Sequence, residues 1–336
     1  YLEELYAIPA FHLARRNPAQ LSEEADRQHR ILADKRGMPG REYHKEAARR
    51  RHSHRSDESY QLQDKQENIK DTFNILISGK DFAGLTDYNA IVTVNTNTHE
   101  ILLTSIPRDY YMEIAGTNGK KDTLSHLFIY DEKVLEETLE NFFDISIDYV
   151  VNVKAEGLVK VVDEVGGITY CSDQAFTTTH ALILNDYNDS GKKKLYVKKG
   201  CQELNGIETL TVARERNAFV GRDRMRQKNC QKIIIAIFDK LKSTNSITNY
   251  NKILEALGDS YSTNIPKELI TSIAKDTIDG AEWKVMTQSV DGSDKWDADI
   301  AILNDKGYAM IPNTDDVVNL SLIHISEPTR RGVISY

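Results

Sequence analysis

The chain has few cysteines and no long hydrophobic run. Its 336 residues include three cysteines, and Cys171, Cys201 and Cys230 show none of the spacings that metal sites use. Two interpretations stay open for them: buried thiols, or a Cys171–Cys201 disulfide in an oxidising compartment. No stretch approaches the ~18 apolar residues of a membrane span, which excludes a transmembrane helix within this chain.

The chain also lacks a signal peptide and an initial methionine, because it begins at Tyr1. We therefore expect a fragment of a longer protein. Residues 1–60 hold ten arginines, two lysines and five of the nine histidines, whereas the body is rich in Lys, Asn and Ile. We interpret residues 1–68 as a polar basic tail that is disordered or foreign to the domain.

Excess positive charge is absent as well. The formal net charge is -8, and it divides into +4 for residues 1–55 and -12 for residues 56–336. Proteins that bind duplex DNA usually carry a basic face, so we predict no nucleic-acid partner. A DNA-binding regulator is therefore the function that we consider weakest, because residues 56–336 are acidic and show no helix-turn-helix pattern.

Arginine is scarce in the body, and this scarcity singles out one segment. Between residues 61 and 319 there are twenty-three lysines but six arginines, and five of the six lie between Arg214 and Arg226. Arginine presents a planar, permanently charged fork of donors that fits phosphate or carboxylate oxygens two at a time. A solvated cationic face is the alternative. We favour a polyanion site, most simply for phosphate or pyrophosphate, within ARERNAFVGRDRMRQK (residues 213–228).

Strand-like and helix-like runs alternate through the body, which indicates an α/β (mixed α+β) layered domain. The turn at residues 95–98 predicts an antiparallel hairpin, and residues 177–200 have the composition of a loop. Strands are predicted at 73–79, 88–95, 100–106, 148–153, 168–171 and 283–287, and helices at 131–143, 155–165, 205–216, 225–241, 250–257 and 266–274.

The domain is predicted over residues 69–319, with a core at 72–242 and a C-terminal extension at 243–319. The string LSLIHISEPTR near the end resembles the translation of a sequencing adapter. Residues 320–336 therefore carry no fold or function prediction.

Two aspartates follow the first predicted strand. Asp81 and Asp87 lie on one loop after a buried strand, where two carboxylates can converge on a hard cation. Turn and cap aspartates are the alternative interpretation.

Further along the chain, Pro107 ends a strand before Arg108 and Asp109. A local salt bridge is the simplest interpretation of that pair. Together, candidate metal carboxylates and arginines from separate segments indicate phosphoryl chemistry.

Six short motifs in this order resemble the LytR-CpsA-Psr family of bacterial cell-wall enzymes. The resemblance covers about residues 72–242, and more loosely the residues that follow. The ordered set is specific, although no single motif is. The motifs are ILISGKD (75–81), TD (86–87), SIPRD (105–109), VGG (165–167), LNG (204–206) and ARER (213–216).

The resemblance implies a three-layer α-β-α domain with a central mixed sheet and a hydrophobic groove for a polyprenyl chain. It implies an Mg²⁺-dependent phosphotransferase at the extracytoplasmic face of the bacterial membrane, usually tethered by an N-terminal helix that this chain lacks. Such enzymes transfer a glycopolymer, for example teichoic acid or capsular polysaccharide, from an undecaprenyl-pyrophosphate carrier to peptidoglycan or another wall acceptor.

The resemblance also assigns roles to individual residues. Asp81 and Asp87 correspond to the Mg²⁺ carboxylates, and Asp109 and Asp223 are supporting residues. The residues expected to be catalytic are Asp87, Arg108, Arg214 and Arg216. The residues expected to bind pyrophosphate are Arg108, Arg214, Arg216, Arg226 and Lys121.

Three positions depart from the family pattern. Leu85 lies where many relatives have arginine, Thr123 where they often have lysine, and Cys230 where glutamine is usual. Each change removes a polar group from the expected site, and Lys120 or Lys121 is a substitute for the missing lysine. The departures motivate the second hypothesis, a catalytically weak polyprenyl-phosphate or glycopolymer-binding protein of the same fold.

Overall fold

The computed structural model describes residues 71–81, 85–182, 193–243, 247–313 and 315–316. The predictions for residues 1–68 and 320–336 lie outside the described residues. The described strands are β1 (Thr72–Lys80), β2 (Thr86–Asn95), β3 (Glu100–Ile106), β4 (Tyr111–Glu113), β5 (Lys121–Thr123), β6 (Tyr149–Lys154), β7 (Ile168–Ser172), β8 (Phe176–Ala181), β9 (Lys194–Val197), β10 (Gly200–Leu204), β11 (Tyr261–Thr263), β12 (Lys284–Ser289), β13 (Gly292–Ile300) and β14 (Asp305–Pro312).

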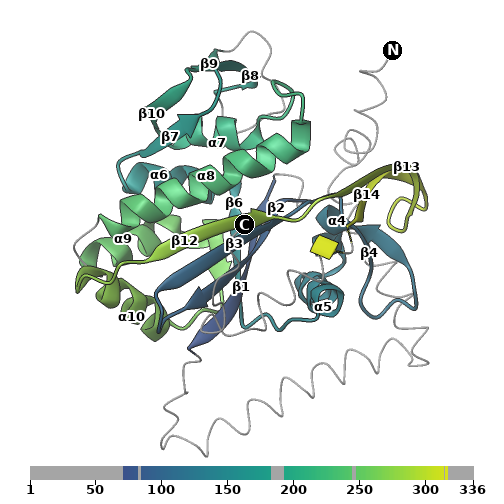
Figure 1. Ribbon diagram of the computed structural model, residues 1–336, viewed down its shortest axis with the longest axis horizontal. Helices are drawn as coiled ribbons and strands as arrows, with labels where there is room; N and C mark the ends of the chain where they lie inside the picture. Colours follow the sequence, from purple (N-terminus) through teal and green to yellow (C-terminus); the bar gives the residue numbers. More distant parts are fainter. Residues whose placement is uncertain (1–70, 82–84, 183–192, 244–246, 314, 317–336) are drawn as a thin grey trace, which may run out of the picture.

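The described helices fall into two groups, on opposite faces of the sheet (Figure 1). Among them, none combines the length and the apolar character that crossing a membrane requires. The helices are α4 (Leu124–Tyr130), α5 (Glu132–Phe143), α6 (Ala155–Glu164), α7 (Gly206–Arg214), α8 (Arg222–Lys242), α9 (Ile247–Leu257) and α10 (Lys267–Ile278), with a 3₁₀ turn, η2 (Gly258–Ser260).

A mixed sheet in the order β11-β6-β1-β2-β3-β12 forms the centre of the domain. Strand β1 pairs antiparallel with β2 and parallel with β6. The predicted hairpin is confirmed, since β2 and β3 are antiparallel and Asn95 lies opposite Glu100. Strand β12 returns parallel to β3 at the sheet edge.

Alternation along β1 creates the layers, because successive side chains of a strand point to opposite faces. Phe73 and Ile75 pack with Ile234 of α8 and Leu269 of α10. Leu76 packs on the other face, in the cluster formed by α4, α5 and the β13–β14 hairpin. The predicted α-β-α fold is therefore confirmed.

A third apolar cluster joins α6, α7 and α8 to the small strand pairs β7–β10 and β8–β9. The prediction of a loop over residues 177–200 was partly wrong, because it missed most of β8 and β9. These strands are short and rich in Thr and Lys, so they lack the hydrophobic run that identifies a buried strand.

The motif LNG allows α7 to pack closely against α6. A Cβ added to Gly206 would lie 2.4 Å from the carbonyl oxygen of Val159, so a larger residue would separate the two helices. Asn205 caps α7 and forms a capping box with Glu208. The Gly206 amide also donates to Asp163 Oδ1 of α6 at 2.7 Å. These contacts fix the direction of α7, whose last residue is Arg214.

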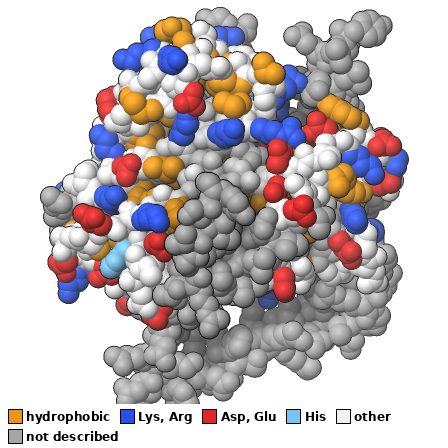
Figure 2. Space-filling model, in the orientation of Figure 1, with side chains coloured by type: hydrophobic (Ala, Val, Ile, Leu, Met, Phe, Trp, Pro, Cys, Tyr) orange, Lys and Arg blue, Asp and Glu red, His pale blue; other side chains and the backbone are white. Residues whose placement is uncertain are grey.

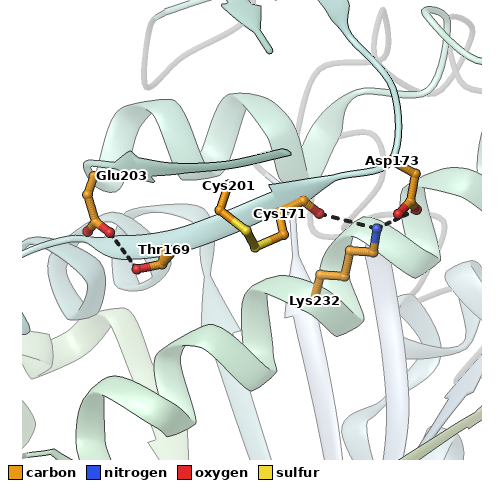
Figure 3. The surroundings of a disulfide bond; sticks show 6 residues. All are labelled: Thr169, Cys171, Asp173, Cys201, Glu203 and Lys232. Atoms are coloured by element: carbon orange, nitrogen blue, oxygen red, sulfur yellow. Dashed lines mark hydrogen bonds and ion pairs between the residues drawn. A yellow bond between two sulfur atoms is a disulfide. The ribbon is translucent and has the colours of Figure 1, made fainter. Parts of the chain in front are cut away.

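The structure contains the Cys171–Cys201 disulfide, which the sequence left open (Figure 3). The two cysteines lie directly opposite each other on β7 and β10. Beside them, Lys232 of α8 donates to the Cys171 carbonyl at 3.3 Å and to Asp173 Oδ2 at 2.7 Å. The bridge and the lysine together hold the β7–β10 pair near α8.

Candidate functional site

A groove with a cavity volume of about 270 Å³ lies between the central sheet and helices α6, α7 and α8. We call its apolar part the wall and its charged end the mouth. The wall is lined by Ile77, Val151, Val153, Ala155, Leu158, Val161, Leu210, Ala213, Ile233, Ile234 and Ile237. The mouth is lined by Lys80, Asp81, Asp87, Lys154, Arg214 and Arg226.

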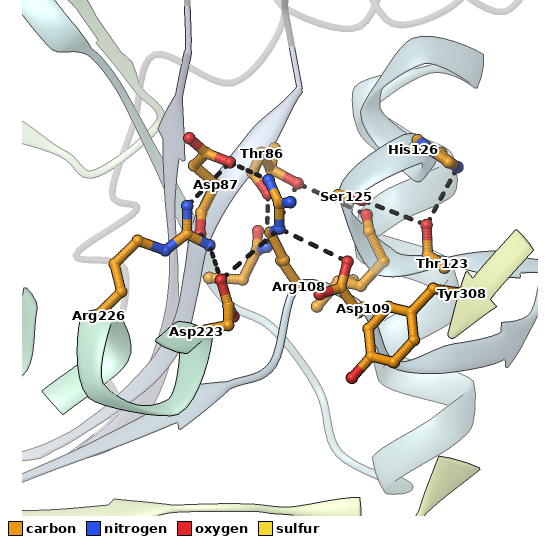
Figure 4. A network of polar contacts seen from close by, with 12 residues as sticks. Thr86, Asp87, Arg108, Asp109, Thr123, Ser125, His126, Asp223, Arg226 and Tyr308 are labelled. Carbon is orange, nitrogen blue, oxygen red and sulfur yellow. Dashed lines mark hydrogen bonds and ion pairs between the residues drawn. The ribbon is translucent and has the colours of Figure 1, made fainter. Parts of the chain in front are cut away.

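Side chains from three segments meet in a network of ion pairs at the mouth (Figure 4). Asp87 Oδ1 lies 2.5 Å from Arg108 Nη1 and 3.2 Å from Arg226 Nη1. Arg226 Nη2 lies 2.6 Å from Asp223 Oδ1, and Arg108 Nε lies 3.5 Å from Asp109 Oδ1. The structure thus brings together β2, the β3–β4 turn and the start of α8, as the sequence predicted.

The network shifts the pKa values of its carboxyl groups in opposite directions. Burial alone would raise the pKa of Asp87, but the charges of Arg226 and Arg108 outweigh burial and hold it well below its usual range. Burial raises the pKa of Asp109 above its usual range, and the charge of Arg108 only partly opposes this. Asp87 is therefore a fixed anion, whereas Asp109 takes up a proton more readily.

The ARER motif is held in place by its glutamate. Glu215 is fully buried, and its carboxylate accepts hydrogen bonds from Thr179 Oγ1 at 3.0 Å and from the Ala218 amide at 2.9 Å. These bonds fix the turn between α7 and α8. The arginines on either side are thereby placed at the site: Arg214 lines the mouth, and Arg216 lies close enough to Arg108 for their charges to interact.

Arg216 differs from the other members of the cluster. Within the part of the chain that the structure describes, its guanidinium makes no hydrogen bond and no ion pair. Burial lowers its pKa, and the neighbouring charges of Arg108 and Arg226 lower it further. The charges of Asp87 and Asp223 oppose these effects without outweighing them. A half-buried cation whose pKa is lowered is stabilised by an added anion, so this position favours phosphate oxygens.

The two other arginines of the predicted cluster lie elsewhere. Arg224 Nε donates to Asp291 at 2.8 Å, and its Nη2 donates to the Gly292 carbonyl at 3.0 Å, so Arg224 joins α8 to β13. Arg222 Nη2 donates to Asn217 Oδ1 at 3.3 Å. Figure 2 shows Lys and Arg side chains near α8, with Asp and Glu side chains toward the β13–β14 hairpin.

Asp81 lines the same mouth as Asp87, which fits the predicted magnesium pair. Asp81 Oδ1 accepts a hydrogen bond from the Leu85 amide at 2.9 Å, which closes the loop between the two aspartates. The described residues contain no group of three or more His, Cys, Asp or Glu that could hold a metal. Two carboxylates suit Mg²⁺, because phosphate oxygens and water usually complete its coordination shell.

Lys121 does not join the mouth. It lies on β5, and its ammonium is 5.8 Å from the centre of the Tyr111 ring. The neighbouring Asp122 is fully buried and accepts hydrogen bonds from Tyr130 Oη at 3.0 Å and from the Ile302 amide at 2.8 Å. Because side chains alternate along a strand, burial of Asp122 directs Lys121 outward.

The three departures lie in apolar or hydrogen-bonded surroundings. Leu85 is buried, and Thr123 Oγ1 lies 3.0 Å from His126 Nδ1. Cys230 lines the groove, and burial raises the pKa of its thiol to about 12. The Cys230 thiol is therefore neutral at physiological pH.

Sequence reasoning missed Lys80 as well as Glu215. The Lys80 ammonium lies 3.3 Å from the centre of the Phe128 ring and lines the mouth, and burial lowers its pKa. Its place beside Asp81, at the end of a buried strand, was the available signal. Glu215 carried no such signal, because a glutamate between two arginines resembles a surface residue.

Known proteins are similar to this chain in sequence and in fold. The LytR_cpsA_psr family model matches residues 38–315. The polyisoprenyl-teichoic acid–peptidoglycan teichoic acid transferase TagU of Bacillus subtilis is 31% identical over 241 residues, which cover 70% of this chain and 74% of that protein. TagU of Enterococcus faecalis is 30% identical over 217 residues, covering 62% and 67%. The crystal structure of B. subtilis TagV superposes with a TM-score of 0.64 at 28% identity, over 76% of this chain and 98% of that one. The chain therefore belongs to the LytR_cpsA_psr family.

Proposed function

We propose that this protein transfers a cell-wall glycopolymer from a polyprenyl-pyrophosphate carrier to peptidoglycan or another wall acceptor. The observation that carries the proposal is a single groove with an apolar wall and an arginine-lined mouth. The wall suits a hydrocarbon chain, and the mouth suits two linked phosphates. The relatives TagU of B. subtilis and of E. faecalis are named as transferases of polyisoprenyl-linked teichoic acid to peptidoglycan.

In this mechanism, the arginines at the mouth bind the pyrophosphate oxygens. Arg226 and Arg108 are already held by carboxylates, which orients their donors before the substrate arrives. Arg214 lines the mouth from the end of α7, and Arg216 lies within charge-interaction range of Arg108 and Arg226 with donors to offer. The four cations stabilise the charge that develops on the leaving phosphate.

The chemical step is an attack by an acceptor sugar hydroxyl on the phosphorus that carries the glycopolymer. The new P–O bond forms as the bond to the lipid phosphate breaks, and the lipid phosphate departs with the electron pair. The hydroxyl proton passes to a base. Asp109 suits this role better than Asp87, because its pKa is raised and that of Asp87 is depressed.

Asp81 and Asp87 would hold Mg²⁺ at the mouth, on the chemistry of their oxygen atoms and their shared position. The bound ion would neutralise phosphate charge. We also place the activity at the extracytoplasmic face of the membrane. The Cys171–Cys201 disulfide supports that location, because disulfides persist in oxidising compartments.

A transfer assay with a lipid-linked glycopolymer and peptidoglycan tests the proposal. We expect Arg108→Ala and Arg214→Ala to lower transfer by about 10²–10³-fold. Lys228→Ala removes an exposed cation from the same helix as Arg226 and is expected to leave transfer unchanged. Full transfer by both arginine variants would contradict the proposed mechanism.

The second candidate, a binding protein without turnover, is motivated by the apolar or neutral side chains of Leu85, Thr123 and Cys230. The same assay separates the two functions. Binding of a lipid-linked pyrophosphate without transfer, with or without Mg²⁺, would favour the binding protein.

A further inference from the structure

The β13–β14 hairpin carries an aromatic pair, the exposed Trp296 and the half-buried Tyr308. Lys295 lies opposite Ala309 and Ala298 lies opposite Gly307, so two residues of β13, Trp296 and Asp297, face the single residue Tyr308. Such a bulge bends the strand and redirects its side chains. Trp296 remains 51% exposed, and its ring centre lies 4.9 Å from that of Tyr308.

The pair lies next to the arginine cluster. Tyr308 is beside Asp109 (Figure 4), and the next-but-one residue, Met310, donates its amide to the Asp109 carbonyl at 2.7 Å. At the start of the other strand, Arg224 of α8 donates to the Gly292 carbonyl at 3.0 Å and to Asp291, the residue before it. The hairpin is therefore fixed to the Arg108–Asp109 turn and to α8, two of the segments that carry the pyrophosphate-binding residues, and the aromatic pair is held beside Asp109.

Polar groups surround the pair. Tyr308 Oη donates to Asp294 Oδ1 at 3.0 Å, and Asp297 adjoins Trp296 in the bulge. Figure 2 shows exposed hydrophobic side chains among acidic and basic ones at this hairpin. An aromatic face attracts the slightly positive C–H bonds of a sugar ring, and carboxylates accept hydrogen bonds from sugar hydroxyls. The same carboxylates would repel an anionic lipid surface.

We propose that Trp296 and Tyr308 form a subsite on which a pyranose ring of the glycan substrate stacks during transfer. The inference rests on the proposed function and specifies where the saccharide, rather than the lipid or the pyrophosphate, is bound. The saccharide belongs either to the lipid-linked donor or to the acceptor glycan strand, and both present the same uncharged ring face.

Intrinsic fluorescence tests this subsite directly, because the chain has two tryptophans. The other one, Trp283, is buried, and its Nε1 has no hydrogen-bond partner among the described residues. Trp283→Phe therefore removes its emission without breaking a hydrogen bond. In this background, emission reports Trp296 alone.

Three probes are titrated into the Trp283→Phe protein. Farnesyl pyrophosphate tests the groove without a sugar. Its N-acetylglucosamine-capped form tests the donor saccharide, and uncross-linked glycan strands from peptidoglycan test the acceptor saccharide. Vesicles that contain anionic lipid test the rival membrane-contact role of an exposed tryptophan.

We expect one of the two saccharide probes to change Trp296 emission, and the responding probe identifies the source of the sugar. Trp296→Ala, assayed with that probe by calorimetry in the otherwise unchanged protein, should weaken binding by about tenfold, while Trp296→Phe retains most of the affinity. Affinity for farnesyl pyrophosphate should not change. Tyr196→Ala, an exposed aromatic on β9, is the matched control and should bind all probes normally.

Saccharide probes that bind without changing Trp296 emission, or that bind equally well to Trp296→Ala, would overturn the subsite. A change in emission with vesicles but with neither saccharide would also overturn it. Failure of the proposed function can be distinguished from failure of the subsite, because in the first case the wild-type protein does not bind farnesyl pyrophosphate. The glycan-strand titration still decides the subsite in that case.

Discussion

The mouth and the wall of the groove differ in what their own contacts contribute to folding. The wall is built from side chains such as Ile233 and Leu210, which are 1% and 4% exposed. Each buried aliphatic side chain of this size stabilises the fold by about 1.5–3 kcal/mol. The mouth buries charged groups instead, and Arg226 is 4% exposed. Burying an ion costs several kcal/mol, which pairing offsets only with good geometry.

This difference indicates that the wall serves both stability and binding, whereas the mouth serves mainly binding. Arg216 makes the contrast clearest, because burial and two neighbouring cations lower its pKa and it has no ion-pair partner in the described residues. A fold selected only for stability would replace it. Variants of the wall and of the mouth should therefore separate stability from activity.

Arg226→Ala is expected to have the largest effect. It leaves Asp87 and Asp223 without their closest shared cation, so transfer should fall by about 10²–10³-fold and the free energy of unfolding by about 3–5 kcal/mol. Transfer kinetics and urea unfolding measure the two effects. Arg226→Lys, which keeps the charge but not the fork of donors, should recover stability better than activity. Wild-type transfer by Arg226→Ala would contradict the role of the mouth.

Ile233→Ala tests the wall. Ile233 lines the groove and belongs to the core cluster of α6, α7 and α8, so truncation should lower the free energy of unfolding by about 2–5 kcal/mol. Its neighbour Ile237 is half-buried and provides a control with a smaller loss. Binding of inorganic pyrophosphate, which has no hydrocarbon chain, should be unchanged. A large loss of pyrophosphate affinity would show that wall and mouth are not separable.

Arg216→Ala should show the opposite pattern. Because Arg216 makes no ion pair in the described residues, we expect its removal to change the free energy of unfolding by less than about 0.5 kcal/mol. Affinity for pyrophosphate should fall by about 10–10²-fold, since a charge-assisted contact contributes about 1.5–3 kcal/mol. Calorimetry and thermal unfolding of the same preparation measure both. A destabilised variant with unchanged affinity would reverse the interpretation of the mouth.

The smallest expected effect is on the pH dependence of stability. The pKa of Asp87 is depressed in the folded protein, so its ion pairs stabilise the fold above the unfolded carboxyl pKa of about 3.9 and lose this contribution as the pH falls further. The difference in stability between wild type and Asp87→Asn should shrink below about pH 4. Asp109→Asn should instead match or exceed wild-type stability at pH 7, because burial raises the pKa of Asp109. Urea unfolding between pH 3 and pH 7 measures both variants, and a difference that grows on acidification would contradict the assignment.

The sequence predicted the mouth better than its supports. Arg108, Arg214, Arg216 and Arg226 stood out because arginine is rare elsewhere in the body. Their meeting point follows from strand ends and a helix start, which periodicity located approximately: the helix predicted from residue 225 begins at Arg222, and the strand predicted from residue 88 begins at Thr86. The function of Glu215 depends on contacts with Thr179 on β8, a strand that composition did not identify. Long-range pairing of that kind has no local signal.

Lys121 and the β13–β14 hairpin show the same limit. The side of β5 on which Lys121 lies depends on burial of Asp122. Asp122 accepts a hydrogen bond from the Ile302 amide, which lies 180 positions further along the chain. Strand β13 is mostly polar and is interrupted by a bulge, so it lacks the alternation that predicts a strand. The aromatic pair of the hairpin became recognisable only when the fold placed it beside Asp109.

The most direct test of the central claim is competition calorimetry with the two halves of the proposed ligand. Farnesyl pyrophosphate should bind the wild-type protein, and both inorganic pyrophosphate and farnesol should displace it, because mouth and wall each hold one half. In Arg216→Ala, pyrophosphate should compete less well while farnesol competes as before. If pyrophosphate fails to displace farnesyl pyrophosphate from the folded wild-type protein, the mouth is not a pyrophosphate site and the proposed mechanism is wrong.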